Sequence, residues 1–141
     1  MIKSDAQRER TLVQIEGFRQ ALTQVEQGTS VKRLAAIRGS YASVIRQLED
    51  ELREYDQLKS GKVLLPRVQR LDQIAPFITK IRIAKGVSQT ELARRLGVSK
   101  QVISRYEESA YQTVGIGRLQ GILDAIGIKT RVSLSASKRE A

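Results

Sequence analysis

The chain has 141 residues, of which 40% are apolar and only 4% aromatic, and it contains neither Cys nor His. The length suits one compact domain, or one small domain with an accessory element, and the missing residue types exclude disulfides, zinc sites, iron–sulfur clusters and catalysis by His or Cys. A formal charge of +10 attracts polyanions at long range, with nucleic acid as the leading candidate and a membrane surface as the other.

The opening segment, Met1 to Arg10, is polar and lacks the apolar core of a signal peptide. No apolar run approaches the ~20 residues that span a bilayer. We therefore expect a soluble, cytoplasmic protein without a membrane partner. The sequence shows no cofactor loop, no nucleophile–base arrangement and no paired carboxylates in an apolar setting, so we expect neither enzyme activity nor a cofactor or metal.

The first predicted helix runs from about Ser4 to Gln27. Its apolar residues recur at spacings of three and four, which places them on one face. Gly28 is a good helix terminator, and Thr29 or Ser30 can cap the helix that follows. The apolar stripe consists of Leu12, Ile15, Phe18, Leu22 and Val25.

The second predicted helix runs from about Val31 to Lys59, with a possible break or kink at Gly39-Ser40 because Gly is unfavourable inside a helix. Residues 1–61 then form an antiparallel helical hairpin. Its narrow seam can be buried against itself, the C-terminal domain or a second chain, so the hairpin is either a packed structural element or a dimerisation or partner-binding element. The stripe of the second helix consists of Leu34, Ile37, Tyr41, Val44, Leu48, Leu52, Tyr55 and Leu58.

Residues 62–71 read as a linker. Ser60-Gly61-Lys62 ends the hairpin, and Pro66 disfavours helix for Leu65. A second domain begins near Leu71.

Three short helices are predicted next. Pro76 suits the first turn of a helix that continues to Lys85, and Gly86 ends it. Ser88 caps the second helix, with Glu91 three residues on in the pattern of a capping box.

The third short helix follows a tight turn. Gly97 suits a left-handed backbone angle there, and Val98 is positioned to fill the angle between the two helices. Ser99 then caps the third helix, Lys100 to Glu107. A short helix, a Gly turn and a further short helix at this spacing define a helix-turn-helix.

The stretch from Val87 to Glu107 resembles the phage repressor, Cro and Xre type of helix-turn-helix. The resemblance is carried by Ser-Gln-x-Glu-Leu-Ala at 88–93, by Gly97, by Ile103 and by Tyr-Glu at 106–107. It implies an all-α protein in which residues 72–127 form a five-helix, lambda-repressor-like domain, with its last helices at about 117–126.

The resemblance also implies roles for particular residues. Arg82 and Glu107 should form a partly buried ion pair that clamps two helices, and Gln89 should bond a DNA phosphate. The sequence departs from the family's usual Glu-Asn-Gly or Glu-Ser-Gly at 107–110, which leaves the conformation of the following loop open.

The predicted DNA-binding residues lie at the start of the second and third short helices. The N-terminal turn of the recognition helix points into the major groove, where Arg or Lys suits guanine and Gln suits adenine. Arg94 and Arg95 add positive charge nearby or are simply solvated. The predicted set is Gln89, Thr90, Ser99, Lys100, Gln101, Ser104 and Arg105.

The period of the apolar pattern changes after Gly127. In residues 128–136, Ile128, Thr130, Val132 and Leu134 alternate with polar residues, which predicts a short strand. A lone strand is unstable, so it would pair with the same strand of a second copy in a dimer ribbon, or pack on its own domain.

The favoured function is that of a sequence-specific transcriptional regulator, specifically a repressor. We expect it to bind a palindromic operator in double-stranded DNA as a homodimer. DNA binding would associate it with the nucleoid. The alternative is an antitoxin that binds a toxin and represses its own operon. An architectural protein that binds DNA without sequence preference is a further reading.

Overall fold

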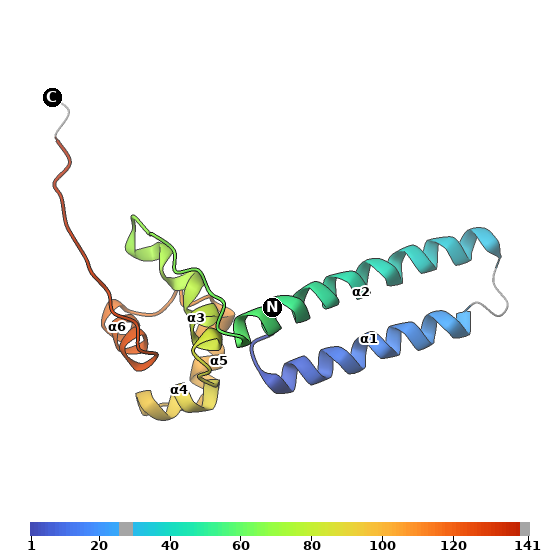
Figure 1. Ribbon diagram of the computed structural model, residues 1–141, viewed down its shortest axis with the longest axis horizontal. Coiled ribbons are helices and arrows are strands. Elements are labelled where there is room, and N and C mark those ends of the chain that lie inside the picture. Colours follow the sequence, from blue (N-terminus) through green and yellow to red (C-terminus); the bar gives the residue numbers. More distant parts are fainter. Residues whose placement is uncertain (26–29, 139–141) are drawn as a thin grey trace.

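The computed structural model describes residues 1–25 and 30–138, and in these ranges every regular element is helical. Two long helices, α1 (Asp5–Val25) and α2 (Val31–Lys59), lie antiparallel and project from a compact helical unit (Figure 1). The predicted all-α class and the N-terminal hairpin are therefore confirmed. The compact unit contains α3 (Ile78–Ala84), α4 (Gln89–Leu96), α5 (Lys100–Glu108) and α6 (Ile116–Ala125).

The hairpin seam is apolar, as predicted, but two stripe positions are wrong. Leu12 is 39% exposed and Val44 38% exposed, whereas Thr11 is buried and Ile45 packs against the hairpin core. Both errors are shifts by one residue, about 100° around a helix, which the three-and-four spacing does not resolve. Ion pairs on the outside, such as Arg19 to Glu49 at 2.6 Å, also join the two helices.

The α1–α2 connection is only partly described. Ser30 is the N-cap of α2, without a side-chain capping bond. Gly28 and Thr29, predicted to end one helix and cap the next, lie outside the described residues. Helix α2 continues through Gly39 and Ser40, so the break considered there does not occur.

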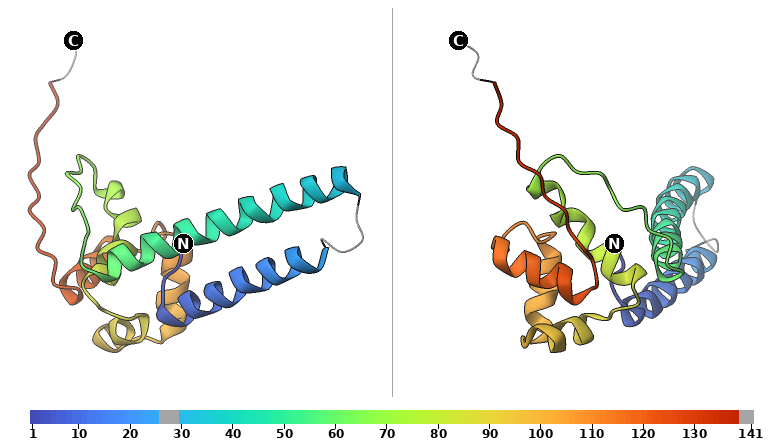
Figure 2. Two further views of the ribbon diagram at one scale, coloured as in Figure 1. Left: turned by 45° about the vertical axis from the view of Figure 1, so that its right-hand side comes forward. Right: turned by 60° about the vertical axis from the view of Figure 1, so that its left-hand side comes forward.

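The base of the hairpin packs on the outer face of α3. Ile83 is 2% exposed and belongs to the hairpin core, beside Ile2, Tyr55 and Leu58. Lys80 also pairs with Glu54 of α2 at 3.0 Å. Part of the seam is thus buried against the C-terminal unit, while the far end of the hairpin stands clear of it (Figure 2).

The start of the compact unit differs from the five-helix expectation. Two 3₁₀ turns, η1 (Leu71–Gln73) and η2 (Ala75–Phe77), precede α3, and Pro76 lies in η2. The unit therefore holds four α-helices after two single turns. Its core is built from apolar residues of all four helices, with Ile78, Ile81, Leu92, Ile103 and Ile122 each at most 4% exposed.

The strand predicted at 128–136 is not observed: this segment, all of which the structure describes, has no assigned secondary structure. It runs away from the helices (Figure 2), with Val132 62% and Leu134 93% exposed. The alternating pattern correctly indicates a non-helical segment, but a strand also requires a paired neighbour. None of the described helices is long and apolar enough to cross a membrane.

Candidate nucleic-acid interface

Helix α4 begins with a side-chain cap. The Ser88 hydroxyl oxygen accepts a hydrogen bond from the Glu91 amide at 3.0 Å, as predicted. The Glu91 carboxylate binds the guanidinium groups of Arg94 at 2.7 Å and Arg95 at 2.9 Å. These hydrogen bonds, from Arg94 first, lower the pKa of Glu91 from 4.5 to about 2. Arg94 and Arg95 are thus held on the surface of α4.

The turn between α4 and α5 has the predicted geometry. Gly97 adopts the left-handed conformation with φ of 67°, where a side chain is disfavoured. The Val98 amide donates to Ala93 at 3.0 Å, and the Val98 side chain packs against the core. Ser99 then caps α5 by accepting from the Val102 amide at 3.4 Å. The two helices are therefore fixed at a defined angle by local sequence.

Helix α5 has a buried face and a solvent face. Ile103 is fully buried against the core and Glu107 is 3% exposed. Gln101 and Arg105 are exposed on the opposite side, and Lys100 is exposed at the first position of the helix. Their side chains make no hydrogen bond or ion pair with any residue that the structure describes, so the polar groups of these side chains are available to a ligand.

A buried ion pair joins α3 to the end of α5. Arg82 Nε donates to Glu107 Oε1 at 2.5 Å and Arg82 Nη2 to Glu107 Oε2 at 3.1 Å, with both side chains at most 2% exposed. Arg82 also donates to the carbonyl oxygens of Val87 at 2.7 Å and Lys3 at 2.9 Å. The predicted clamp is present, and it is fully buried.

Two further side chains satisfy the Glu107 carboxylate. Gln89 Nε2 donates to Oε2 at 2.7 Å, and the Tyr111 hydroxyl donates to Oε1 at 3.3 Å. Burial, followed by the charge of Glu107, raises the pKa of Tyr111 well above its usual value. Glu107 thus connects the start of α4 to the end of α5.

The loop after α5 contains two consecutive non-glycine residues in the left-handed region, Ala110 with φ of 48° and Tyr111 with φ of 59°. The Tyr111 amide donates to Tyr106 at 2.7 Å, and its side chain is 1% exposed. Burial of this ring and its bond to Glu107 compensate for the unfavourable backbone. The sequence left the conformation of this loop open, because it departs from Glu-Asn-Gly. In the structure, the chain leaves α5 through two residues with left-handed backbone angles.

The predicted site residues lie on α4 and α5 and at the cap between them. Thr90 is exposed in the first turn of α4, and Ser104 is half-buried on α5 beside the exposed Arg105. Gln89 differs from the expectation, since its amide nitrogen is bonded to Glu107 within the protein. Sequence reasoning missed this bond, because no local signal marks contacts between residues 18 positions apart.

Comparison with known proteins agrees with this geometry. Residues 78–132, about two-fifths of the chain, match a protein-family model described as helix-turn-helix. No curated protein and no solved structure matches the chain. The segment 78–132 is a helix-turn-helix DNA-binding domain of the Xre and lambda-repressor type, which confirms the resemblance found in the sequence.

Proposed function

We propose that the protein is a sequence-specific transcriptional repressor that reads a palindromic operator as a homodimer. The observation that carries the proposal is the two-sided character of α5. Its apolar face is anchored by Ile103, and the exposed side chains of Lys100, Gln101 and Arg105 have no intramolecular partner among the described residues. Such a helix is suited to the major groove.

The roles of the side chains follow from base chemistry. Lys100 and Arg105 are suited to the O6 and N7 acceptors of guanine, and Gln101 to adenine. Each good bidentate contact contributes about 1–3 kcal/mol of discrimination. Ser104 adds a short donor and acceptor beside them. Phosphate contacts fall to Thr90 and Ser99 at the helix starts, where backbone N–H groups also point outward. Gln89 adds one through the second N–H of the amide nitrogen that donates to Glu107.

The hairpin supports dimerisation because charge is segregated along α2. Residues 31–46 contain Lys32, Arg33, Arg38 and Arg46 and no acidic residue, whereas residues 47–59 contain five acidic and two basic residues. A second hairpin packed antiparallel would set the basic end of each against the acidic end of the other. The acidic groups already have surface partners, but exposed ion pairs are weak and exchange readily.

Apolar burial favours the same arrangement. In the far half of the hairpin, Phe18, Leu22, Leu34, Ile37 and Tyr41 are only partly buried, although the rings of Phe18 and Tyr41 contact each other in a tilted arrangement, with centroids 5.6 Å apart. Two packed hairpins form a four-helix bundle, which buries such a seam completely.

Selection of bound sequences from a random DNA pool tests the proposal. The expected result is one enriched palindrome, with half-sites about 34 Å apart on one face of the duplex. Its affinity at stated salt should exceed that of random duplex by a factor above about 10³. A ratio near one would instead identify an architectural protein that binds DNA without sequence preference.

The antitoxin function has the same DNA-binding half and adds a toxin as protein partner. The far end of the hairpin, which stands clear of the compact unit (Figure 1), gives such a partner a surface away from α5. A small open reading frame next to the gene, whose product co-purifies with this chain and is inhibited by it, distinguishes this function from that of a simple repressor.

A further inference from the structure

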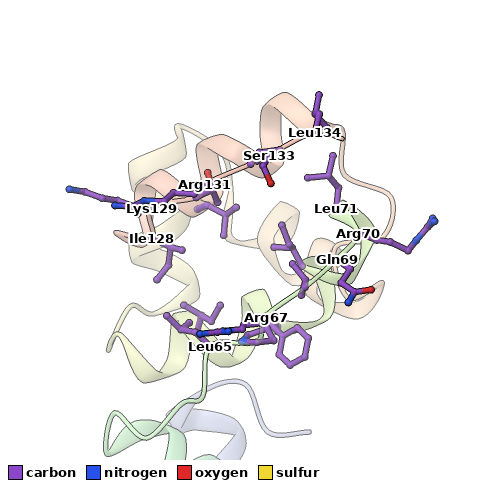
Figure 3. Close-up of a pocket in the computed structure, with 18 of the residues that line it drawn as sticks. Leu65, Arg67, Gln69, Arg70, Leu71, Ile128, Lys129, Arg131, Ser133 and Leu134 are labelled. Carbon is purple, nitrogen blue, oxygen red and sulfur yellow. The ribbon is translucent and has the colours of Figure 1, made fainter. Parts of the chain in front are cut away.

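A groove of about 750 Å³ lies between the linker and the C-terminal tail. Residues 65–71 form one wall and residues 128–135 the other, with Ile128 and Leu65 toward one end and Leu71 and Leu134 toward the other (Figure 3). Ile74, Phe77, Ile81 and Leu123 also line it. No residue of α4 or α5 takes part, so the groove can be filled while the recognition helix holds DNA.

Both walls offer free main-chain groups. Within the ranges that the structure describes, no backbone N–H or C=O of residues 64–68 or 129–138 makes a hydrogen bond. Extended segments with unpaired edges are templates for an added strand. The groove therefore fits an extended peptide better than a helix or a compact small molecule.

Four large apolar side chains that line the groove are exposed. Leu65 is 59% exposed, Leu71 50%, Val132 62% and Leu134 93%. Apolar side chains gathered at one place on a surface mark a site of protein interaction. They also argue against DNA as the occupant, because a duplex offers phosphate and sugar to such a surface.

The charge of the walls selects the partner. The two walls, residues 65–71 and 128–135, contain four basic residues and no acidic one. Arg70 pairs with Asp72, whereas Arg67, Lys129 and Arg131 have no ion pair with the residues described. A second copy of the tail would bring more positive charge to this surface, so electrostatics disfavour it and favour an acidic partner.

We propose that this groove binds an extended segment of another protein in which apolar and acidic residues alternate. The segment adds as a strand along the tail, its apolar side chains face Phe77 and Leu123, and its carboxylates meet Arg67, Lys129 and Arg131. This partner site is independent of the operator proposed above and of the hairpin dimer.

Selection from a random peptide library displayed on phage, against the full chain, tests the proposal. We expect enrichment of peptides in which Val, Ile or Leu alternates with Glu or Asp. The best peptide, synthesised and labelled, should bind the charge-reversed double variant Arg67→Glu/Arg131→Glu at least tenfold more weakly. The matched control is Lys85→Glu/Arg118→Glu, at two exposed residues outside both the groove and the hairpin. It makes the same charge change and should leave peptide affinity unchanged.

Two further binding measurements test the strand pairing and the independence from DNA. A proline in the middle of the enriched peptide should abolish binding, because proline cannot pair as a strand interior. An excess of duplex DNA should not displace the peptide. The proposal is overturned if the selection enriches basic peptides or no peptide at all. It is also overturned if the control variant loses peptide affinity to the same extent, or if DNA displaces the peptide. So does a dimer that dissociates in the Arg67→Glu/Arg131→Glu variant, which would assign the groove to a second copy.

Discussion

The guanidinium of Arg82 donates a hydrogen bond to the carbonyl oxygen of Lys3, 79 positions earlier in the chain, at 2.9 Å. The same side chain holds Glu107 at the end of the recognition helix. One buried arginine therefore ties the base of the hairpin to the DNA-binding helix.

Arg82→Met should destabilise the protein by about 3–5 kcal/mol, because it leaves the Glu107 carboxylate buried without its cation. Urea unfolding followed by circular dichroism measures the change. The double variant Arg82→Met/Glu107→Leu should recover part of the loss, since it removes the unpaired charge. The exposed pair of Arg53 and Asp50 supplies the control, and Arg53→Met should change little. A loss in Arg82→Met no larger than in Arg53→Met would contradict the clamp.

Arg105→Ala should relax base preference at one position in each half-site, with a loss of about 1–3 kcal/mol for the preferred sequence. Gln89→Ala should weaken all sequences similarly, because a phosphate contact carries no sequence information. Binding of operator and single-base variants by fluorescence anisotropy distinguishes the two. Since Gln89 also bonds Glu107, its variant needs a thermal unfolding curve as a control. Unchanged affinity and preference in Arg105→Ala would disprove the assigned reading face.

These positions show what local sequence predicts well. Ser88, Gly97 and Ser99 act within three or four residues of themselves, so their caps and turn followed from spacing alone. The register of long-range packing did not follow: Thr11 rather than Leu12 is buried, and Gln89 turns inward to Glu107. The tail at 128–136 failed as a strand because pairing depends on a partner that periodicity does not reveal.

Ala110→Gly should stabilise the protein by about 1 kcal/mol, because glycine adopts a φ of 48° without the steric cost borne by alanine. The midpoint of thermal unfolding should rise accordingly. Ala42→Gly makes the same change inside helix α2 and should destabilise by about 1 kcal/mol. Equal effects of both variants would show that the loop is not held in the left-handed region.

The Glu91 carboxyl should titrate near pH 2 in the folded protein, as measured by NMR of the side-chain carboxyl carbon. Its folded pKa is below the unfolded value, so its contribution to stability is complete above about pH 4.5 and is lost as pH falls toward 2. Arg94→Ala should raise the titration midpoint of the Glu91 carboxyl, because the hydrogen bond from Arg94 is the largest cause of its lowered pKa. An unshifted midpoint in Arg94→Ala would show that the pair does not persist in solution.

Arg33→Glu/Arg46→Glu should weaken the proposed dimer at least tenfold in sedimentation equilibrium, because it places like charges against the acidic end of the partner hairpin. The effect should shrink as salt rises. Arg67→Glu/Arg131→Glu at the groove makes the same charge change, so it is the matched control and should leave the dimer intact. A monomeric wild-type chain at high concentration, or identical association of all three proteins, would refute a hairpin dimer.

Helix α3 belongs to both hydrophobic cores, with Ile78 and Ile81 in one and Ile83 in the other. The two halves of the chain should for this reason melt in a single cooperative transition, with no temperature at which one is native and the other denatured. A fragment starting at the linker would expose Ile83 to water. It would also lack the Lys3 carbonyl oxygen, which accepts a hydrogen bond from Arg82 in the full chain. Biophysical work on the isolated DNA-binding half would therefore underestimate the robustness it has when the hairpin is attached.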